Sequence, residues 1–190
     1  MQNRTHDSSN DIQKNKQALS RLVVAGLFAA LAVALNYALI AVPQVKLFNL
    51  IVFSAGYFGG IYAGALSGGI AAAVYSIFNP YNMGMFPPIP LLASQVFCMA
   101  LIGAVGGACR KFNFLSGTGF LRTTKAALLG FLSSLLYNVV VTAAGAYLFG
   151  AFKEAFIAGI PFMLVNIGAN VVIFAVLLPL MVPLDKRFRY

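Results

Sequence analysis

The stretch LVVAGLFAALAVALNYALIAV, residues 22–42, decides the fold of this chain. It contains no formal charge, and at about 20 residues per crossing it is long enough for a helix to span a lipid bilayer. Arg21 stands directly before it, as basic residues do at the edge of a membrane. The run therefore predicts the first transmembrane helix.

The rest of the chain has the same apolar character. Of its 190 residues, 61% are hydrophobic and 9% are charged, and the mean hydropathy is +0.87. Soluble domains carry about 25% charged residues, so this chain has too few to hydrate the surface of a soluble enzyme. We predict a single membrane domain over residues 21–190. Residues 1–20 are polar and predict a disordered cytoplasmic tail.

Other charge-free runs place the remaining crossings. They predict six transmembrane helices, over about residues 22–42, 47–65, 67–80, 90–109, 126–148 and 158–182. The second and third come from one long run, residues 47–78, which we divide at Ser67, Gly68 and Gly69 because paired glycines favour a turn. The predicted fold class is thus an all-α, polytopic membrane protein.

Basic residues set the orientation. They cluster before the first predicted span, between the fourth and fifth, and after the sixth: Lys14, Lys16, Arg21, Arg110, Lys111, Arg122, Lys125, Lys186, Arg187 and Arg189. With six crossings these clusters fall on one side, which the positive-inside rule assigns to the cytoplasm. Both termini are then cytoplasmic, and Lys46 and Lys153 face outward. Because the basic residues flank spans, the net charge of +9 indicates a membrane and not a nucleic acid.

The chain lacks residue patterns that most catalysis needs. Its only histidine, His6, is in the tail, and Cys98 and Cys109 have no metal-ligand spacing, so we expect no metal site. The sequence has no phosphate-binding loop for ATP and no nucleophile–base pair, so we expect neither an enzyme nor a bound cofactor. No charged residue falls within a predicted span, which disfavours coupling to protons or sodium.

Polar side chains within and between the predicted spans are the candidates for binding a small molecule. Amides are costly in hydrocarbon unless paired, so they face the bundle interior, either as interhelical contacts or as a binding site. Several lie near the outer helix ends, beside a proline-rich loop over residues 79–90 that is either a connector or a cover. The candidate substrate-binding residues are Asn36, Tyr37, Tyr75, Asn79, Tyr81, Asn82, Gln95, Tyr137, Asn138, Asn166 and Asn170.

Small residues recur at every fourth position over Gly56, Gly60, Gly64 and Gly68. This spacing places them on one helix face, where another backbone can approach closely, either for packing or as a sliding or docking surface. Ala25 and Ala29 form a similar pair near the cytoplasmic end of the first span. There they would offer a smooth face to a second membrane subunit.

Taken together, these residues resemble the substrate-binding (S) components of energy-coupling factor (ECF) transporters, which are small six-helix bacterial vitamin importers. Ala25-Gly-Leu-Phe-Ala29 is similar to the AxxxA docking motif of the family, and residues 57–69 are similar to its glycine-rich junction of the second and third helices. Residues 160–180, followed by Asp185-Lys-Arg187, resemble its sixth helix and basic tail. The likeness covers about residues 21–189.

The resemblance implies a high-affinity binder of a vitamin or related micronutrient, in the outer half of a bundle in the bacterial plasma membrane. It also implies a membrane coupling subunit that docks at Ala25 and Ala29, and two cytoplasmic ATPases. From the residues, an uncharged pocket favours a largely neutral, ring-containing molecule. Lys46 would admit an anion if the first external loop folds inward.

Two other functions stay open. A stand-alone secondary carrier or facilitator for a small neutral solute would need no ATPase, and uptake by the purified chain in liposomes would distinguish it. A membrane enzyme acting on lipid is disfavoured because the sequence offers no catalytic groups.

Overall fold

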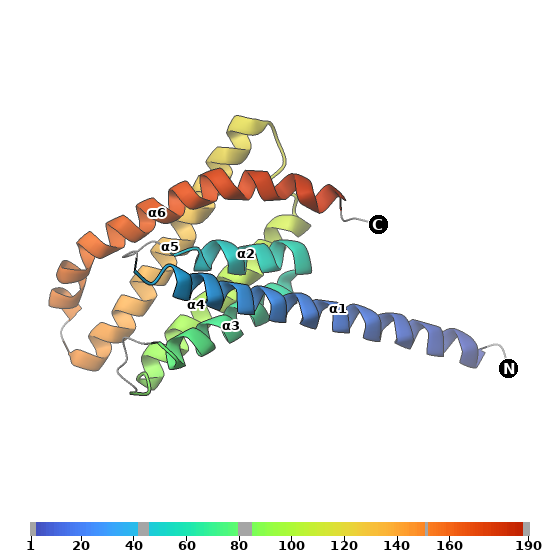
Figure 1. Ribbon diagram of the computed structural model, residues 1–190, viewed down its shortest axis with the longest axis horizontal. Coiled ribbons are helices and arrows are strands. Elements are labelled where there is room, and N and C mark those ends of the chain that lie inside the picture. Colours follow the sequence, from blue (N-terminus) through green and yellow to red (C-terminus); the bar gives the residue numbers. More distant parts are fainter. Residues whose placement is uncertain (1–2, 42–45, 80–84, 151, 188–190) are drawn as a thin grey trace.

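The computed structural model describes residues 3–41, 46–79, 85–150 and 152–187, and helices make up most of that part of the chain. In order these are α1 (Asn3–Ala38), α2 (Phe48–Gly59), α3 (Ile61–Ile77), α4 (Ile89–Lys111), α5 (Gly119–Phe149) and α6 (Phe152–Arg187) (Figure 1). The described residues contain no strand. The predicted all-α class is confirmed.

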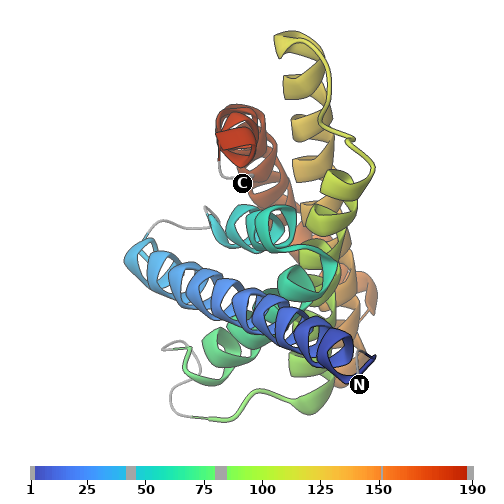
Figure 2. The same ribbon diagram turned by 90° about the vertical axis from the view of Figure 1, so that its right-hand side faces the viewer.

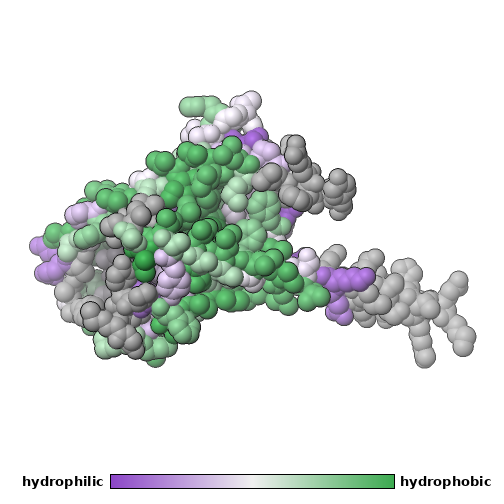
Figure 3. Space-filling model, viewed as in Figure 1, coloured by the Kyte–Doolittle hydropathy of each residue, from purple (hydrophilic) through white to green (hydrophobic). Residues whose placement is uncertain are grey.

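Four of these helices are long and apolar enough to cross a membrane, over Ala18–Ala38, Ile89–Lys111, Gly119–Leu148 and Phe152–Pro183. Each exposes large apolar side chains, among them Leu27, Phe97, Leu132 and Leu164. Figure 3 shows such apolar surface covering the middle of one face. Water disfavours so much exposed apolar area, whereas lipid tails accommodate it. The chain therefore has the features of a helical multi-pass membrane protein.

The other two helices are shorter. α2 has 12 residues and α3 has 17, so at 1.5 Å per residue they are about 18 Å and about 26 Å long. Neither reaches the roughly 30 Å of a hydrocarbon core by itself. α2 is enclosed by protein instead, because all of residues 48–57 are buried. Figure 2 shows α2 lying between α1 and α6, and it contacts both.

The turn between α2 and α3 lies earlier than the sequence predicted. The chain turns at Gly60, whose φ of +91° suits glycine because a Cβ would be strained there. α3 then continues through Ser67, Gly68 and Gly69, so the predicted division there is wrong. Gly68 is needed for packing and not for a turn, since a Cβ on it would overlap the carbonyl oxygen of Met99 on α4.

Glycines bring α2 and α3 against the backbone of α4. A Cβ added to Gly56 of α2 or to Gly64 of α3 would overlap the carbonyl oxygen of Gly103. Small residues allow this close approach of helices in membrane bundles. The packing interpretation of the recurring glycines is therefore confirmed for Gly56 and Gly64, while Gly60 forms the turn.

The first helix is longer than the predicted span. α1 begins at Asn3, so a helix replaces the disordered tail predicted for residues 1–20 wherever the structure describes it. Residues 3–20 contain no proline or glycine that would end a helix. The first part of α1 therefore extends beyond the other helices as one continuous helix (Figure 1). The start of α1 and the end of α6 lie at the same side of the molecule (Figure 1).

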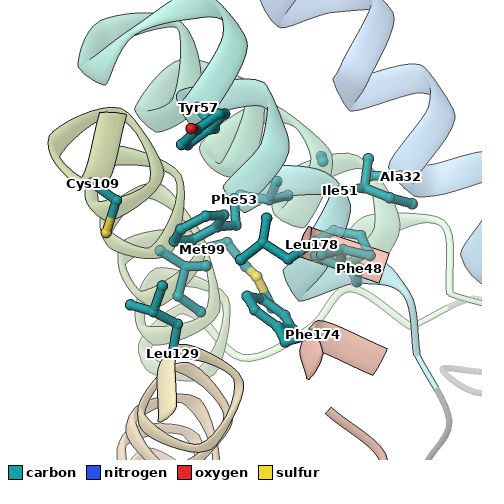
Figure 4. Packing of buried hydrophobic residues seen from close by; sticks show 14 of the residues in the cluster. Ala32, Phe48, Ile51, Phe53, Tyr57, Met99, Cys109, Leu129, Phe174 and Leu178 are labelled. Atoms are coloured by element: carbon teal, nitrogen blue, oxygen red, sulfur yellow. The ribbon is translucent and has the colours of Figure 1, made fainter. Parts of the chain in front are cut away.

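The hydrophobic core surrounds α2 and takes buried side chains from all six helices. The rings of Phe53 and Phe174 pack edge to face, with their centroids 5.5 Å apart. Met99 and Leu178 lie close to this pair in Figure 4 and belong to the same buried cluster. α5 packs mainly along α6, so this core ties the α5–α6 pair to the first four helices.

Helix ends gather into two groups at opposite sides of the first four helices. At one side, the α2–α3 junction and the end of α4 form an open groove of about 560 Å³, lined by Arg21, Gly59, Gly60, Ile61, Tyr62, Gly107, Arg110, Lys111 and Asn113. We call it the basic groove. Within it, Nη1 of Arg110 donates a hydrogen bond of 2.6 Å to the carbonyl oxygen of Phe58. The opposite ends of these helices surround the candidate site.

Candidate small-molecule binding site

A polar cavity lies where all six helices converge, at the side of the bundle away from the basic groove. Every helix contributes to its wall, so the cavity exists only in the assembled bundle. Its lining residues are Asn36, Lys46, Phe48, Asn49, Ala72, Tyr75, Ser76, Gln95, Met99, Tyr137, Asn166 and Asn170. Phe48 and Met99 also belong to the hydrophobic core, which therefore borders the cavity (Figure 4).

Most of the predicted binding residues that the structure describes come together here. Asn36, Tyr75, Gln95, Tyr137, Asn166 and Asn170 line the cavity. Tyr37 and Asn138 contact its wall from behind, whereas Asn79 follows α3 and does not line the cavity. Tyr81 and Asn82 lie outside the described residues.

Three asparagines of α5 and α6 form a chain of amides. Nδ2 of Asn138 donates to Oδ1 of Asn166 at 3.0 Å. Nδ2 of Asn170 donates to the carbonyl oxygen of Asn166 at 2.9 Å and approaches its Oδ1 at 3.4 Å. These bonds fix the amide of Asn166 in the wall of the cavity. Oδ1 of Asn170 is buried and accepts no hydrogen bond from the described residues.

Aromatic rings form another part of the wall. The ring of Tyr75 lies 5.5 Å from that of Tyr37 and 5.9 Å from that of Phe48, measured between centroids. Tyr37 is held in place because its hydroxyl donates to the carbonyl oxygen of Phe78 at 2.8 Å. Aromatic side chains of this kind provide surface on which a planar ligand stacks.

A serine–glutamine pair links α3 to α4 at the cavity. The hydroxyl of Ser76 donates to Oε1 of Gln95. Because Oε1 is the acceptor, the amide nitrogen of Gln95 remains a donor for other partners.

Among the described residues of this lining, Lys46 is the one that carries a formal charge. Its Nζ lies 5.9 Å from the centroid of the Tyr75 ring, and burial lowers the pKa of Lys46 below its ordinary value. The expectation of an uncharged pocket is therefore wrong. In the structure Lys46 lies in the cavity wall. This is the inward position of the first external loop that the sequence left as an alternative.

Sequence reasoning also missed Asn49 and Ser76 as lining residues. Asn49 is buried at the start of α2, and it is the only amide of the predicted second span. That position was itself a signal, since an amide within an apolar run needs a polar partner. Ser76 gave a weaker signal, because a helical serine can satisfy its hydroxyl on its own backbone.

The polar cavity is narrow as it stands. Its volume is about 30 Å³, which is room for about two waters. A ring-containing ligand would thus have to push the wall apart. A further hollow of about 220 Å³ between α2, α4 and α5 has an almost wholly apolar lining that includes Leu101, Val105 and Leu132. That lining suits an acyl chain better than a polar solute.

The predicted docking pair is buried within the chain. Ala25 is 0% exposed and Ala29 is 4% exposed, on the side of α1 that packs against α2 and α3. The neighbouring row of small residues, Gly26, Ala30 and Ala34, is exposed and also has a spacing of four.

No protein-family model, curated protein or solved structure matches the chain. Support for a function therefore comes from the polar cavity and the helices around it.

Proposed function

We propose that this chain is the substrate-binding (S) component of an energy-coupling factor importer, and that it binds a vitamin or related micronutrient in the polar cavity. One observation carries the proposal. Polar side chains from every helix meet at one end of a bundle whose outer surface is apolar. Buried polar groups are costly in a membrane bundle and typically mark a ligand or transport site.

The proposal includes six membrane passages, with both termini in the cytoplasm of a bacterial cell. The division of the helix ends into two groups supports it, because α1 to α4 alternate in direction between the basic groove and the polar cavity. Arg21, Arg110 and Lys111 line the groove, and the positive-inside rule assigns such a side to the cytoplasm. The polar cavity would then open toward the outside.

Powering by separate subunits is also part of the proposal, namely a membrane coupling subunit and two cytoplasmic ATPases. The absence of a carboxylate from the apolar runs supports this, because proton- or sodium-driven carriers use such groups. We propose that the coupling subunit meets the exposed row of Gly26, Ala30 and Ala34. The burial of Ala25 and Ala29 favours this register over the predicted one.

Co-expression with a bacterial coupling subunit and its ATPases tests the proposal. We expect the three to co-purify with this chain, and Ala30→Leu to lower the yield about tenfold or more, since added side-chain volume separates closely packed helices. Ala93→Leu, at an exposed position of α4, is the matched control and should leave the yield unchanged. Ala29→Leu should instead destabilise the chain itself by about 1–3 kcal/mol.

Two outcomes would contradict the proposal. One is a failure of the wild-type chain to co-purify with any coupling subunit. The other is substrate uptake by the purified chain alone in liposomes, which would identify a stand-alone carrier or facilitator.

A further inference from the structure

Lys46 brings a positive charge into the polar cavity, and none of the described residues of its lining carries a negative one. No aspartate or glutamate lines the cavity, and Lys46 forms no salt bridge with the residues that the structure describes. Its recorded contact is with the ring of Tyr75, at 5.9 Å from Nζ to the centroid. A cation–π contact at this distance offsets only part of the cost of desolvating an ammonium group.

The other described residues of the cavity lining are uncharged, and several of them are polar. Asn36, Asn49 and Gln95 line the same cavity and carry amide nitrogens that can donate hydrogen bonds. Donors of this kind cannot neutralise an ammonium group, but they suit an anion that sits beside one. Burial also lowers the pKa of Lys46. It removes water from the ammonium group, and the uncharged lining supplies no counter-charge in place of that water.

Oδ1 of Asn170 is a second group without a partner among the described residues, and it is a hydrogen-bond acceptor where Lys46 is a donor. The residue is 1% exposed, it lines the cavity, and its Oδ1 accepts no hydrogen bond from the described residues. Lys46 lies two residues before the start of α2, whereas Asn170 lies near the middle of α6. The cavity lining therefore contains a cation on its loop side and, on the side of α6, a buried amide oxygen that accepts no hydrogen bond from the described residues.

We infer that the substrate is a small organic monocarboxylate with an N–H or O–H donor away from its carboxylate, the carboxylate pairing with Lys46 and the donor with Oδ1 of Asn170. This inference rests on the proposed function and specifies its substrate class. A carboxylate fits better than a phosphate, because one ammonium balances one negative charge, whereas a phosphate monoester carries about −1.5 to −2.

The test uses the full-length protein in detergent and three related probes. p-Aminobenzoate has both features, benzoate has only the carboxylate, and p-aminobenzamide has only the donor. Equilibrium dialysis measures how much of each probe the protein retains. We expect p-aminobenzoate to be retained roughly 10- to 100-fold more strongly than p-aminobenzamide. The uncharged amide cannot form the buried, hydrogen-bonded ion pair with Lys46 that the carboxylate forms.

Variants separate the two ends of the ligand. Lys46→Gln should remove the preference for the acid, Lys46→Arg should keep it, and Lys153→Gln, at an exposed lysine of α6, should have no effect. Asn170→Leu should remove the preference for p-aminobenzoate over benzoate. Lys46→Arg preserves charge, so it shows whether a loss in Lys46→Gln comes from the charge or from misfolding.

Equal retention of acid and amide, or unchanged acid retention in Lys46→Gln, would overturn the inference. If the amide is retained and the cavity-filling variant Ala72→Leu abolishes this, the proposed binding function stands and only the substrate class is wrong. If the wild-type chain retains none of the probes, the substrate class is again wrong, and the co-purification experiment above decides separately on the proposed function.

Discussion

Asn166 is the residue on which the amide chain of α5 and α6 depends. Its Oδ1 is the acceptor for Nδ2 of Asn138, and its backbone carbonyl accepts from Asn170. Sequence reasoning found all three asparagines because an amide in an apolar run has few partners other than another amide. It could not pair them, since pairing depends on how α5 and α6 rotate against each other.

Asn166→Leu keeps the side-chain size but removes the acceptor. We expect it to lower the free energy of unfolding by about 1–3 kcal/mol, because the half-buried amide of Asn138 loses one of its two acceptors. Thermal unfolding in detergent measures the change. Thr123→Val, at an exposed position of α5, is the control. Equal unfolding temperatures for wild type and Asn166→Leu would contradict the role given to this amide.

A pH dependence follows from Lys46. Burial lowers its pKa below 10.5, so a bound carboxylate should be retained fully below that lowered pKa and released as the pH rises through it. The stability of the ligand-free protein should instead rise with pH between the lowered pKa and 10.5. In that range the unfolded chain still binds the proton that Lys46 of the folded chain has released.

The pH profile of p-aminobenzoate retention checks this expectation. Lys46→Arg should have a flat profile over the same range, because a guanidinium stays charged to a pH of about 12. Tyr75 and Tyr137 are the other titratable side chains in the lining, and both are present in each protein, so they cancel in the comparison. The same fall in both proteins would assign the titration to a different group.

At the scale of the elements, glycine contacts determine how α2 and α3 sit on α4. Gly103 faces Gly56 and Gly64 together, so one residue of α4 supports two helices. The spacing of the glycines predicted a close-packed face, but the turn was placed wrongly. Glycine serves both for close helix packing and for turns, so the sequence could not show which role Gly68 has. Its contact with Met99 of α4 shows that the role is packing.

Gly103→Ala should separate these helices. A Cβ there would overlap the backbone of Gly64, so we expect a loss of about 1–3 kcal/mol in stability and a weaker ligand site, because α2, α3 and α4 all line the polar cavity. Gly145→Ala on α5 is the matched control, since nothing lies within 4 Å of its added Cβ. If the two variants unfold at the same temperature, the close packing is not needed.

At the scale of the whole molecule, long charge-free stretches predicted an all-helical bundle. This part was predictable because a backbone in lipid has to satisfy its own hydrogen bonds, so long apolar runs become helices. Much of the cavity was predictable for the same reason, as Asn36, Gln95 and Asn166 illustrate. The position of Lys46 was not, because the path of a loop depends on the helices that it joins.

The central claim is that this membrane protein binds a small molecule among its six helices. The most direct test is mass spectrometry of molecules released by denaturing the purified protein, comparing wild type with folded Ala72→Leu and Ala93→Leu. We predict about one ligand molecule per chain in wild type and Ala93→Leu, and a loss in Ala72→Leu, whose added volume fills a narrow cavity. Equal amounts in all three, or none in the wild type, would contradict the claim.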